Sequence, residues 1–245
     1  TARTYCAAVK AKGGAAGAPQ TVAALSDPAQ ALGEQFCMAE AEATAQGIEL
    51  AKGFTGFTPE QIAAQCRDFG ALLADQVALL GTTPRDDMVA SVQGWGAQSG
   101  MTEAQLAGTA KVCLSMGYST DDMGVALGSA LVLTGAGNMT YAEFLGHHLA
   151  GGVGIEAHPE LAVDWYDLAA NAAAIGQTPV FGAATPERGA LIHKAAMALA
   201  GRSEAVPAVA PVPVSAPVLE QGGAASGLAG FGAAAAQLMQ QPKGN

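Results

Sequence analysis

Large apolar side chains and charged side chains are both scarce in this chain of 245 residues. Aromatic residues make up 5% of it and charged residues 13%, although 50% is hydrophobic by count. Much of the apolar half is alanine, which forms helices readily but removes little area from water when it is buried. A core of such side chains gains little stability per residue. We therefore expect closely packed helices, stabilised further by disulfides or partner subunits.

Basic residues and long apolar runs are also lacking. Lys and Arg number 11 against 21 Asp and Glu, and the formal net charge is −10 at pH 7. Surfaces that bind nucleic acids or anionic membranes need clustered Lys and Arg, and the 11 basic residues of this chain are scattered. No apolar run reaches the ~18 residues that span a bilayer. The longest, 125–137, is interrupted by glycines and hydroxyl groups and predicts a buried helix, so we expect no transmembrane segment and no nucleic-acid partner.

The chain has four cysteines but no Cys-x-x-Cys pair, which excludes zinc ribbons, thioredoxin-type redox motifs and haem attachment. An even number at wide spacing suits two disulfides in an oxidising compartment, the alternative being four buried thiols in a cytosolic protein. Of the three possible connectivities we favour Cys6–Cys37 with Cys66–Cys113. The first would tie a Gly/Ala-rich arm to the first helix, and the second would clamp two helices of the body.

The first residue, Thr1, also favours export, because a processed protein begins in this way after its signal peptide is removed. A trimmed sequence would begin in the same way. Together with the paired cysteines, this start predicts a bacterial protein that is exported to the periplasm or the extracellular space.

Helix start signals recur along the chain, and alternating strand patterns are missing. Thr58, Thr102 and Thr140 each stand three residues before Glu or Gln, as in a capping box, and Asp27-Pro28 is another start signal. Glycines fall where the preceding helices should stop. The sequence predicts an all-α body of helical hairpins, stacked as a repeat-like or irregular bundle. The expected helices are 28–52, 59–80, 85–98, 103–116, 121–135, 141–151, 159–175 and 186–200.

Composition divides the chain into four parts. Residues 1–25 show no sustained period and predict an arm that is ordered only if it is tethered, and 26–202 form the all-helical domain. Residues 203–221 are rich in Pro, Ala and Val and predict an extended linker. The Gly/Ala-rich tail, 222–245, would make sense docked in a groove of its own body or of a neighbour, with a disordered tail as the alternative.

A candidate polar site lies at Glu143, His147 and His148. Adjacent residues on a helix point about 100° apart, so the two histidines cannot face one metal ion. Glu143 and His147 stand four residues apart, but a zinc site of the His-Glu-x-x-His type needs two histidines at that spacing. We expect hydrogen-bonded or surface histidines, no metal, no cofactor and no catalytic residue. A metal site assembled from distant parts of the chain stays open.

Residues 140–175 resemble one Sel-one-like repeat, a longer relative of the tetratricopeptide repeat. The family pattern has Leu-Gly on a first helix, a Gly-rich turn, and Trp-Tyr followed by alanines on a second helix. The resemblance implies a helical hairpin in which Gly and Ala allow close approach and the aromatic pair supplies buried area. One repeat cannot bury its own face, so 103–135 and 186–200 should stack on it. The matching residues are Leu145, Gly146, Gly151, Gly152, Trp165, Tyr166 and Ala169.

These observations favour a non-enzymatic, exported helical-repeat protein that mediates protein–protein contacts or self-association in a bacterial envelope or extracellular assembly. The alternative is an enzyme or binder associated with peptidoglycan. It would use His147 or His148 with Glu143 in a groove.

Overall fold

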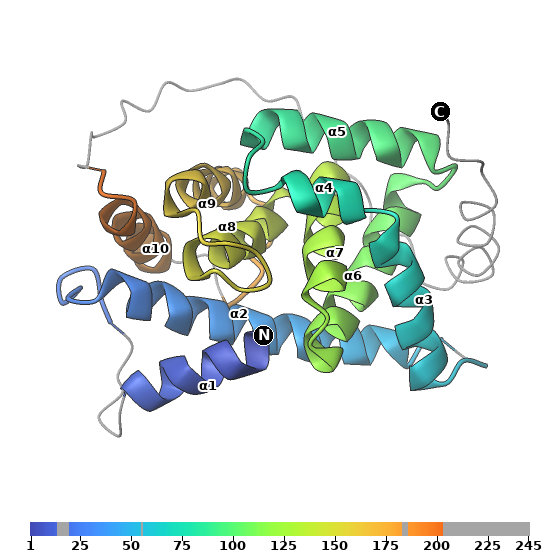
Figure 1. The fold of residues 1–245 in the computed structure, drawn as a ribbon, viewed down its shortest axis with the longest axis horizontal. Helices are drawn as coiled ribbons and strands as arrows, with labels where there is room; N and C mark the ends of the chain where they lie inside the picture. The colour runs from blue at the N-terminus through green and yellow to red at the C-terminus, as the bar shows by residue number, and fades with distance from the viewer. Residues whose placement is uncertain (14–19, 55, 183–185, 203–245) are drawn as a thin grey trace.

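The structure is a computed structural model that describes residues 1–13, 20–54, 56–182 and 186–202. Within these ranges the chain forms ten α-helices and one 3-10 turn without any strand, which confirms the predicted all-α class (Figure 1). The predicted linker 203–221 and tail 222–245 lie outside the described residues. The elements are α1 (Ala2–Gly13), α2 (Pro28–Ala51), α3 (Pro59–Ala71), α4 (Ala74–Leu79), α5 (Arg85–Gln98), α6 (Glu103–Thr120), α7 (Met123–Gly135), η1 (Met139–Tyr141), α8 (Ala142–Gly151), α9 (Pro159–Ala174) and α10 (Pro186–Leu199).

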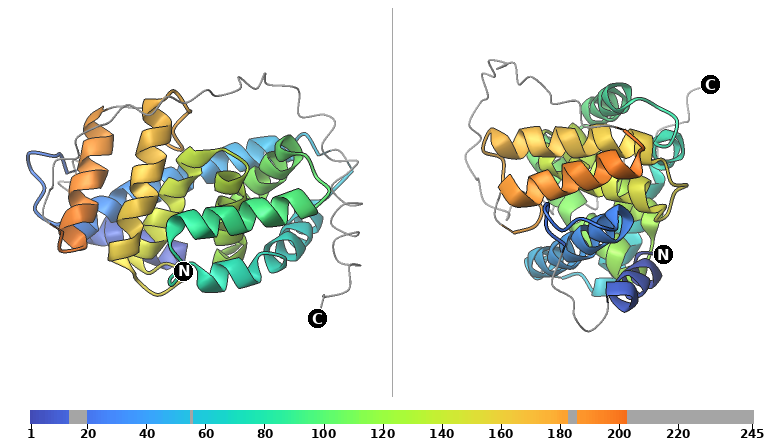
Figure 2. Two further views of the ribbon diagram at one scale, coloured as in Figure 1. Left: turned by 90° about the horizontal axis from the view of Figure 1, so that it is seen from above. Right: turned by 90° about the vertical axis from the view of Figure 1, so that its left-hand side faces the viewer.

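Helix α7 is buried, as the apolar run predicts, and lies at the centre of the body. All its residues from Val125 to Thr134 are buried, and it packs against α3, α4, α5, α6 and α8. The 24-residue helix α2 runs along one side and packs against α1, α6, α8 and α10 (Figure 1). Helices α9 and α10 lie side by side at the end of the molecule remote from α3 (Figure 2). Among the described residues, no helix combines the length and apolarity that a membrane crossing needs.

Side-chain caps start several helices where the sequence predicts them. Thr58 and Thr102 each complete a capping box with a glutamine three residues on. Thr140 does not cap a helix, because it lies inside η1 and its hydroxyl donates to the carbonyl oxygen of Thr178 at 2.8 Å. The capping box predicted at Thr140 is therefore wrong: a tertiary hydrogen bond takes the place of the local one.

Two helix boundaries differ from the prediction for reasons of packing. The expected helix 59–80 is interrupted between α3 and α4, at a bend that leaves Leu73 and Leu80 with no exposed surface. The expected helix 103–116 continues to Thr120, because Gly117 serves helix packing rather than helix termination. A Cβ atom at Gly117 would lie 2.5 Å from the backbone nitrogen of Ala126 in α7. The missing side chain thus lets α6 and α7 cross closely.

Both disulfides have the connectivity that the sequence favours. Cys6–Cys37 joins α1 to α2 with a Cα–Cα distance of 5.6 Å, and Cys66–Cys113 joins α3 to α6 at 5.0 Å. All four cysteines are therefore paired. The α3–α6 pair is buried, whereas the α1–α2 pair is partly exposed.

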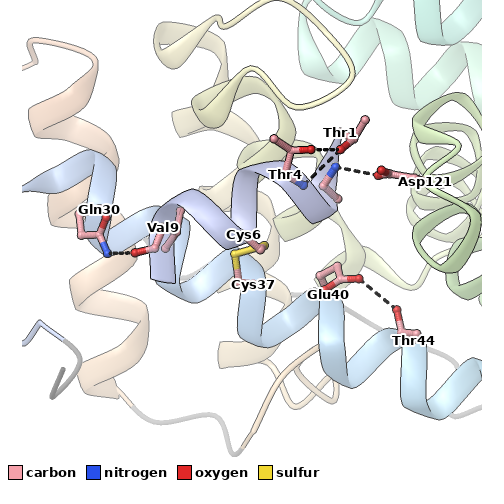
Figure 3. Close-up of a disulfide and its surroundings, with 10 residues drawn as sticks. Thr1, Thr4, Cys6, Val9, Gln30, Cys37, Glu40, Thr44 and Asp121 are labelled. Carbon is pink, nitrogen blue, oxygen red and sulfur yellow. Dashed lines mark hydrogen bonds between the residues drawn. A yellow bond between two sulfur atoms is a disulfide. The ribbon is translucent and has the colours of Figure 1, made fainter. Parts of the chain in front are cut away.

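The predicted arm, 1–25, contains a regular element that the sequence analysis missed, the helix α1. It is tethered to the body by more than its disulfide (Figure 3). The backbone N–H of Ala2 donates to Asp121 Oδ1 at 3.0 Å, and Gln30 Nε2 donates to the carbonyl oxygen of Val9 at 2.9 Å. Tethering along its length explains why a segment without a clear apolar period is a helix here.

Candidate functional site

His148, on α8, lies in the core and makes a hydrogen bond through each ring nitrogen. Its Nδ1 atom is bonded to the carbonyl oxygen of Val153, and its Nε2 atom lies 3.0 Å from the hydroxyl of Tyr118. A carbonyl oxygen only accepts, so Nδ1 carries the proton and Nε2 accepts from the tyrosine hydroxyl. Burial lowers the pKa of His148 to about 4, and the ring is neutral at neutral pH.

His147 is equally enclosed but faces other partners. Its Nε2 atom lies 3.3 Å from Glu143 Oε1, and its Nδ1 atom lies 2.8 Å from the hydroxyl of Tyr166 on α9. Since the carboxylate accepts, Nε2 donates and Nδ1 accepts from the tyrosine hydroxyl. Burial lowers the pKa of His147 as well. Phe36 of α2 packs against both imidazole rings, with centroid distances of 5.6 Å to His147 and 5.3 Å to His148.

Glu143 forms a buried ion pair with Arg188, which comes from α10. The guanidinium donates to both carboxylate oxygens, at 2.9 Å for Oε2, and its Nε atom donates to Gln35 Oε1 of α2 at 2.8 Å. Burial alone would raise the pKa of Glu143, but hydrogen bonds from Arg188 and His147 lower it to about 2. The carboxylate is therefore charged and paired, and Arg188, through its bonds to Glu143 and Gln35, fixes α10 against α8 and α2.

A groove of about 340 Å³ opens between α9 and α10, directly beside this ion pair. We call it the α9–α10 groove. Glu143 and Arg188 line its buried base, and Asp167 and His193 form a second, half-exposed pair in its wall, 2.9 Å apart. Its other walls are made of small or apolar residues, among them Ala169, Ala170, Ala173, Ala174, Gly189 and Ile192.

Two smaller pockets lack a pair of acidic and basic side chains. One of about 240 Å³ lies between α5, α6 and α7 and is mostly apolar, with Trp95 and Leu106 in its lining. The other, of about 140 Å³, lies under α1 and is lined by Tyr5, Leu32 and His147. Neither places an acid and a base together, so the α9–α10 groove is the candidate site.

The residues of the predicted repeat form one packed hairpin of α8 and α9. A Cβ atom at Gly146 would lie 2.9 Å from the ring of Tyr166, so the ring can pack here only because the glycine has no side chain. Gly152 has a φ of 65° and ends α8 in the left-handed conformation. Leu145, Trp165 and Ala169 are buried. Gly151 has another role: a Cβ atom there would lie 2.9 Å from the hydroxyl of Tyr5, so the missing side chain leaves room for α1 on the hairpin.

The candidate polar residues meet as part of a larger set than the sequence predicts. Arg188, Gln35, Tyr118 and Tyr166 complete the hydrogen bonds of Glu143 and the two histidines. In the sequence, only the four-residue spacing of Glu143 and His147 indicates that members of this set meet. The other sequence feature that points to it is Arg188, a lone arginine in the first turn of an alanine-rich helix.

The site holds few groups that could act on a substrate. Each carboxylate of the groove is bonded to a basic partner, and the disulfides leave no thiolate. In the described ranges, no cluster of three or more His, Cys, Asp or Glu side chains is arranged to hold a metal ion. Comparison of the chain with models of protein families, with curated proteins and with solved structures gives no match in any of the three.

Proposed function

We propose that this chain is a non-enzymatic, exported helical-repeat protein that binds other proteins or its own copies in a bacterial envelope or extracellular assembly. The α9–α10 groove is the observation that carries the proposal. Its alanine-rich wall includes the exposed residues Ala170 and Ala174, while Glu143 is paired with Arg188 and Asp167 is hydrogen-bonded to His193. Binding of a partner would remove this apolar surface from water, which is favourable.

The state of the histidines supports binding rather than catalysis. A general acid or base needs a pKa near the working pH and hydrogen-bond access to the substrate. His147 and His148 are 2% and 0% exposed, and every ring nitrogen already has a partner inside the protein. Both rings therefore serve as internal hydrogen-bond partners: His147 holds Glu143 and Tyr166, which line the groove, and His148 holds Tyr118 and the backbone at Val153.

The two disulfides support an exported location, because structural disulfides persist in oxidising compartments and are rare in the cytosol. The bond between α1 and α2 is partly exposed, so a reductant could reach it. A periplasmic or extracellular setting would keep this bond, and with it α1, in place.

The hairpin of α8 and α9 supports the repeat-like part of the proposal. Its contact between Gly146 and Tyr166 and its left-handed turn at Gly152 are what a Sel-one-like repeat would need at 140–175. Helix α10 packs on α9 and α7 packs on α8, so the hairpin has neighbours on both sides. Repeat proteins of this kind act by binding through the surfaces that their stacked helices form.

The decisive experiment measures assembly of the full chain and of two matched variants. Ala170→Arg places a charge in the groove, and Ala198→Arg places the same charge on an exposed position of α10 outside it. Arginine is a good helix former, so both variants should fold. Light scattering after size exclusion, combined with cross-linking in the exporting cell, should give an assembly that Ala170→Arg loses and Ala198→Arg keeps. A chain that is monomeric at every concentration and has no cross-linked partner sensitive to Ala170→Arg would refute the proposal.

The alternative, a peptidoglycan-associated enzyme or binder, draws on Glu143, which lines the groove. His147 and His148, which it would also use, are enclosed in the core. Cosedimentation with purified cell wall tests it directly. Binding or wall cleavage that disappears in Ala170→Arg and persists in Ala198→Arg would favour this function over protein binding.

A further inference from the structure

The chain leads directly from the α9–α10 groove into a segment that could occupy it. Helix α10, one wall of the groove, ends at Leu199, and the described residues end at Arg202. The sequence then continues through the Pro-rich residues 203–221 to residues 222–241, which contain no charged side chain. In those 20 residues the large apolar side chains, Leu228, Phe231, Leu238 and Met239, are separated mainly by Gly and Ala.

We propose that residues 222–241 bind in the α9–α10 groove of their own chain, as an internal ligand that a partner must displace. This inference rests on the proposed function, because it assigns the occupant of the same binding surface.

The charges of the groove favour this occupant. Glu143 forms an ion pair with Arg188, and Asp167 is hydrogen-bonded to His193, so both acids of the groove already have a partner within the protein. A charged ligand would bring an uncompensated charge against a largely buried pair, which is unfavourable. An uncharged segment leaves both pairs intact and covers the alanine wall.

The shapes also correspond. The groove wall is built from alanines of α9 and from Gly189 of α10, so it can be approached closely by a backbone that carries small side chains. Leu228 and Phe231 stand three residues apart with only Ala and Gly between them. If these residues bind as a helix, side chains three residues apart lie on one face, so both could enter one short groove.

Distance favours binding within one chain over binding to a second copy. The 19 residues of 203–221 reach about 60 Å when extended at ~3.1 Å per residue. The longest helix of the body, α2 with 24 residues, is only about 36 Å long. The linker can therefore reach the groove from Arg202 in any direction, and a short tether gives an effective concentration on the order of millimolar.

Occupation from within the chain would make the groove self-inhibited. A partner that binds the same surface would compete with residues 222–241, so its apparent affinity would fall in proportion to the fraction of chains with an open groove. Assembly would then require a partner that binds more tightly than the internal segment, or the removal of that segment.

Amide hydrogen exchange on the full chain tests the inference. Phe231→Asp removes one anchor, Ala170→Arg blocks the groove, and Ser215→Asp is the matched control, with a new charge in the linker. We expect residues 222–241 of the wild type to exchange more slowly than the free peptide of the same sequence. Either Phe231→Asp or Ala170→Arg should speed that exchange by roughly tenfold or more, because a buried Phe or groove contact is lost. Ser215→Asp should leave it unchanged.

Three results would overturn the inference: wild-type exchange over 222–241 as fast as in the free peptide, protection that neither variant removes, or protection that rises with protein concentration, which would indicate a second copy. Assembly is scored separately by light scattering and cross-linking. If Ala170→Arg abolishes assembly while 222–241 is unprotected, the proposed function stands and this inference fails. If 222–241 is protected, and no assembly exists either in the wild type or in Phe231→Asp, whose groove is open, the inference stands and the proposed function fails.

Discussion

Acid should destabilise this protein in a pH range set by His148. The pKa of this buried ring is about 4 in the folded chain, against an ordinary value of 6.5. As pH falls below 6.5 the unfolded chain takes up the proton first, so the free energy of unfolding decreases until about pH 4 and then levels off for this group. A pKa difference of about 2.5 corresponds to about 3 kcal/mol, and the slope within the range is about 1.4 kcal/mol per pH unit.

The surroundings of the ring explain why it resists protonation. Nδ1 already donates to the carbonyl oxygen of Val153, and Nε2 accepts from the hydroxyl of Tyr118. A second ring proton would have to displace the hydroxyl proton of Tyr118 and place a charge in a core position that has no exposed surface. The nearby His147 opposes that charge further.

Urea unfolding of the full chain between pH 7 and pH 4 measures this effect. The His148→Gln variant has no group that titrates at this position, so it should lose most of the dependence of stability on pH. Tyr118→Phe should keep that dependence, because the imidazole of His148 still titrates. Some slope should remain in His148→Gln, since burial also lowers the pKa of His147. If the wild type is equally stable at pH 7 and pH 4.5, or if His148→Gln keeps the full slope, the assignment of a neutral buried ring is wrong.

Three further perturbations follow from the packing. The double variant Cys6→Ser/Cys37→Ser opens a loop with a sequence separation of 31. On the chain-entropy model it should lower the free energy of unfolding by about 4 kcal/mol, measured by denaturant titration. A loss well under 1 kcal/mol would mean that α1 is held in place without its disulfide. Gly146→Ala should lower the free energy of unfolding by about 1–3 kcal/mol, because its Cβ would lie 2.9 Å from the ring of Tyr166. The control Gly94→Ala, at an exposed position of α5, should raise it by roughly 0.5–1 kcal/mol. Equal melting temperatures for the two variants would contradict the packing. Arg188→Met should lower the free energy of unfolding by about 3–5 kcal/mol at pH 7, because it removes the positive charge that compensates the buried carboxylate of Glu143. Urea titration should show that this loss shrinks in acid, as the carboxylate becomes protonated.

Features that depend on a few neighbouring residues were predictable from the sequence. The capping boxes at Thr58 and Thr102 form as expected, because the side chain and the backbone group that it caps lie within one helical turn. The four-residue spacing of Glu143 and His147 gives a contact for the same reason. The class of the fold follows from many such local signals acting together.

Features that depend on tertiary neighbours were not predictable. Thr140 matches the sequence pattern of a capping box, yet its hydroxyl donates to the carbonyl oxygen of Thr178, 38 residues away. Gly117 has the position of a helix stop, yet it is a crossing point of two helices. Arg188 completes the candidate site from a helix 45 residues beyond Glu143, and no spacing rule connects the two. In each case the competing partner is known only once the helices are packed.

The sequence predicts a core of small side chains that gains little stability per residue, but small and large residues are distributed unevenly in the core. Small residues serve the crossings of α2, α6 and α7, where a Cβ atom at Gly47 would lie 2.1 Å from Cβ of Ser115. The buried aromatic residues Phe36, Tyr118 and Tyr166 instead pack against the two histidines of α8, and Phe144 packs against Tyr118. Tyr166, which lines the α9–α10 groove, is therefore held by an aromatic cluster of the core. A surface held in one shape loses little conformational entropy when it binds, and a partner can gain affinity from such a groove even though its walls are made largely of alanine.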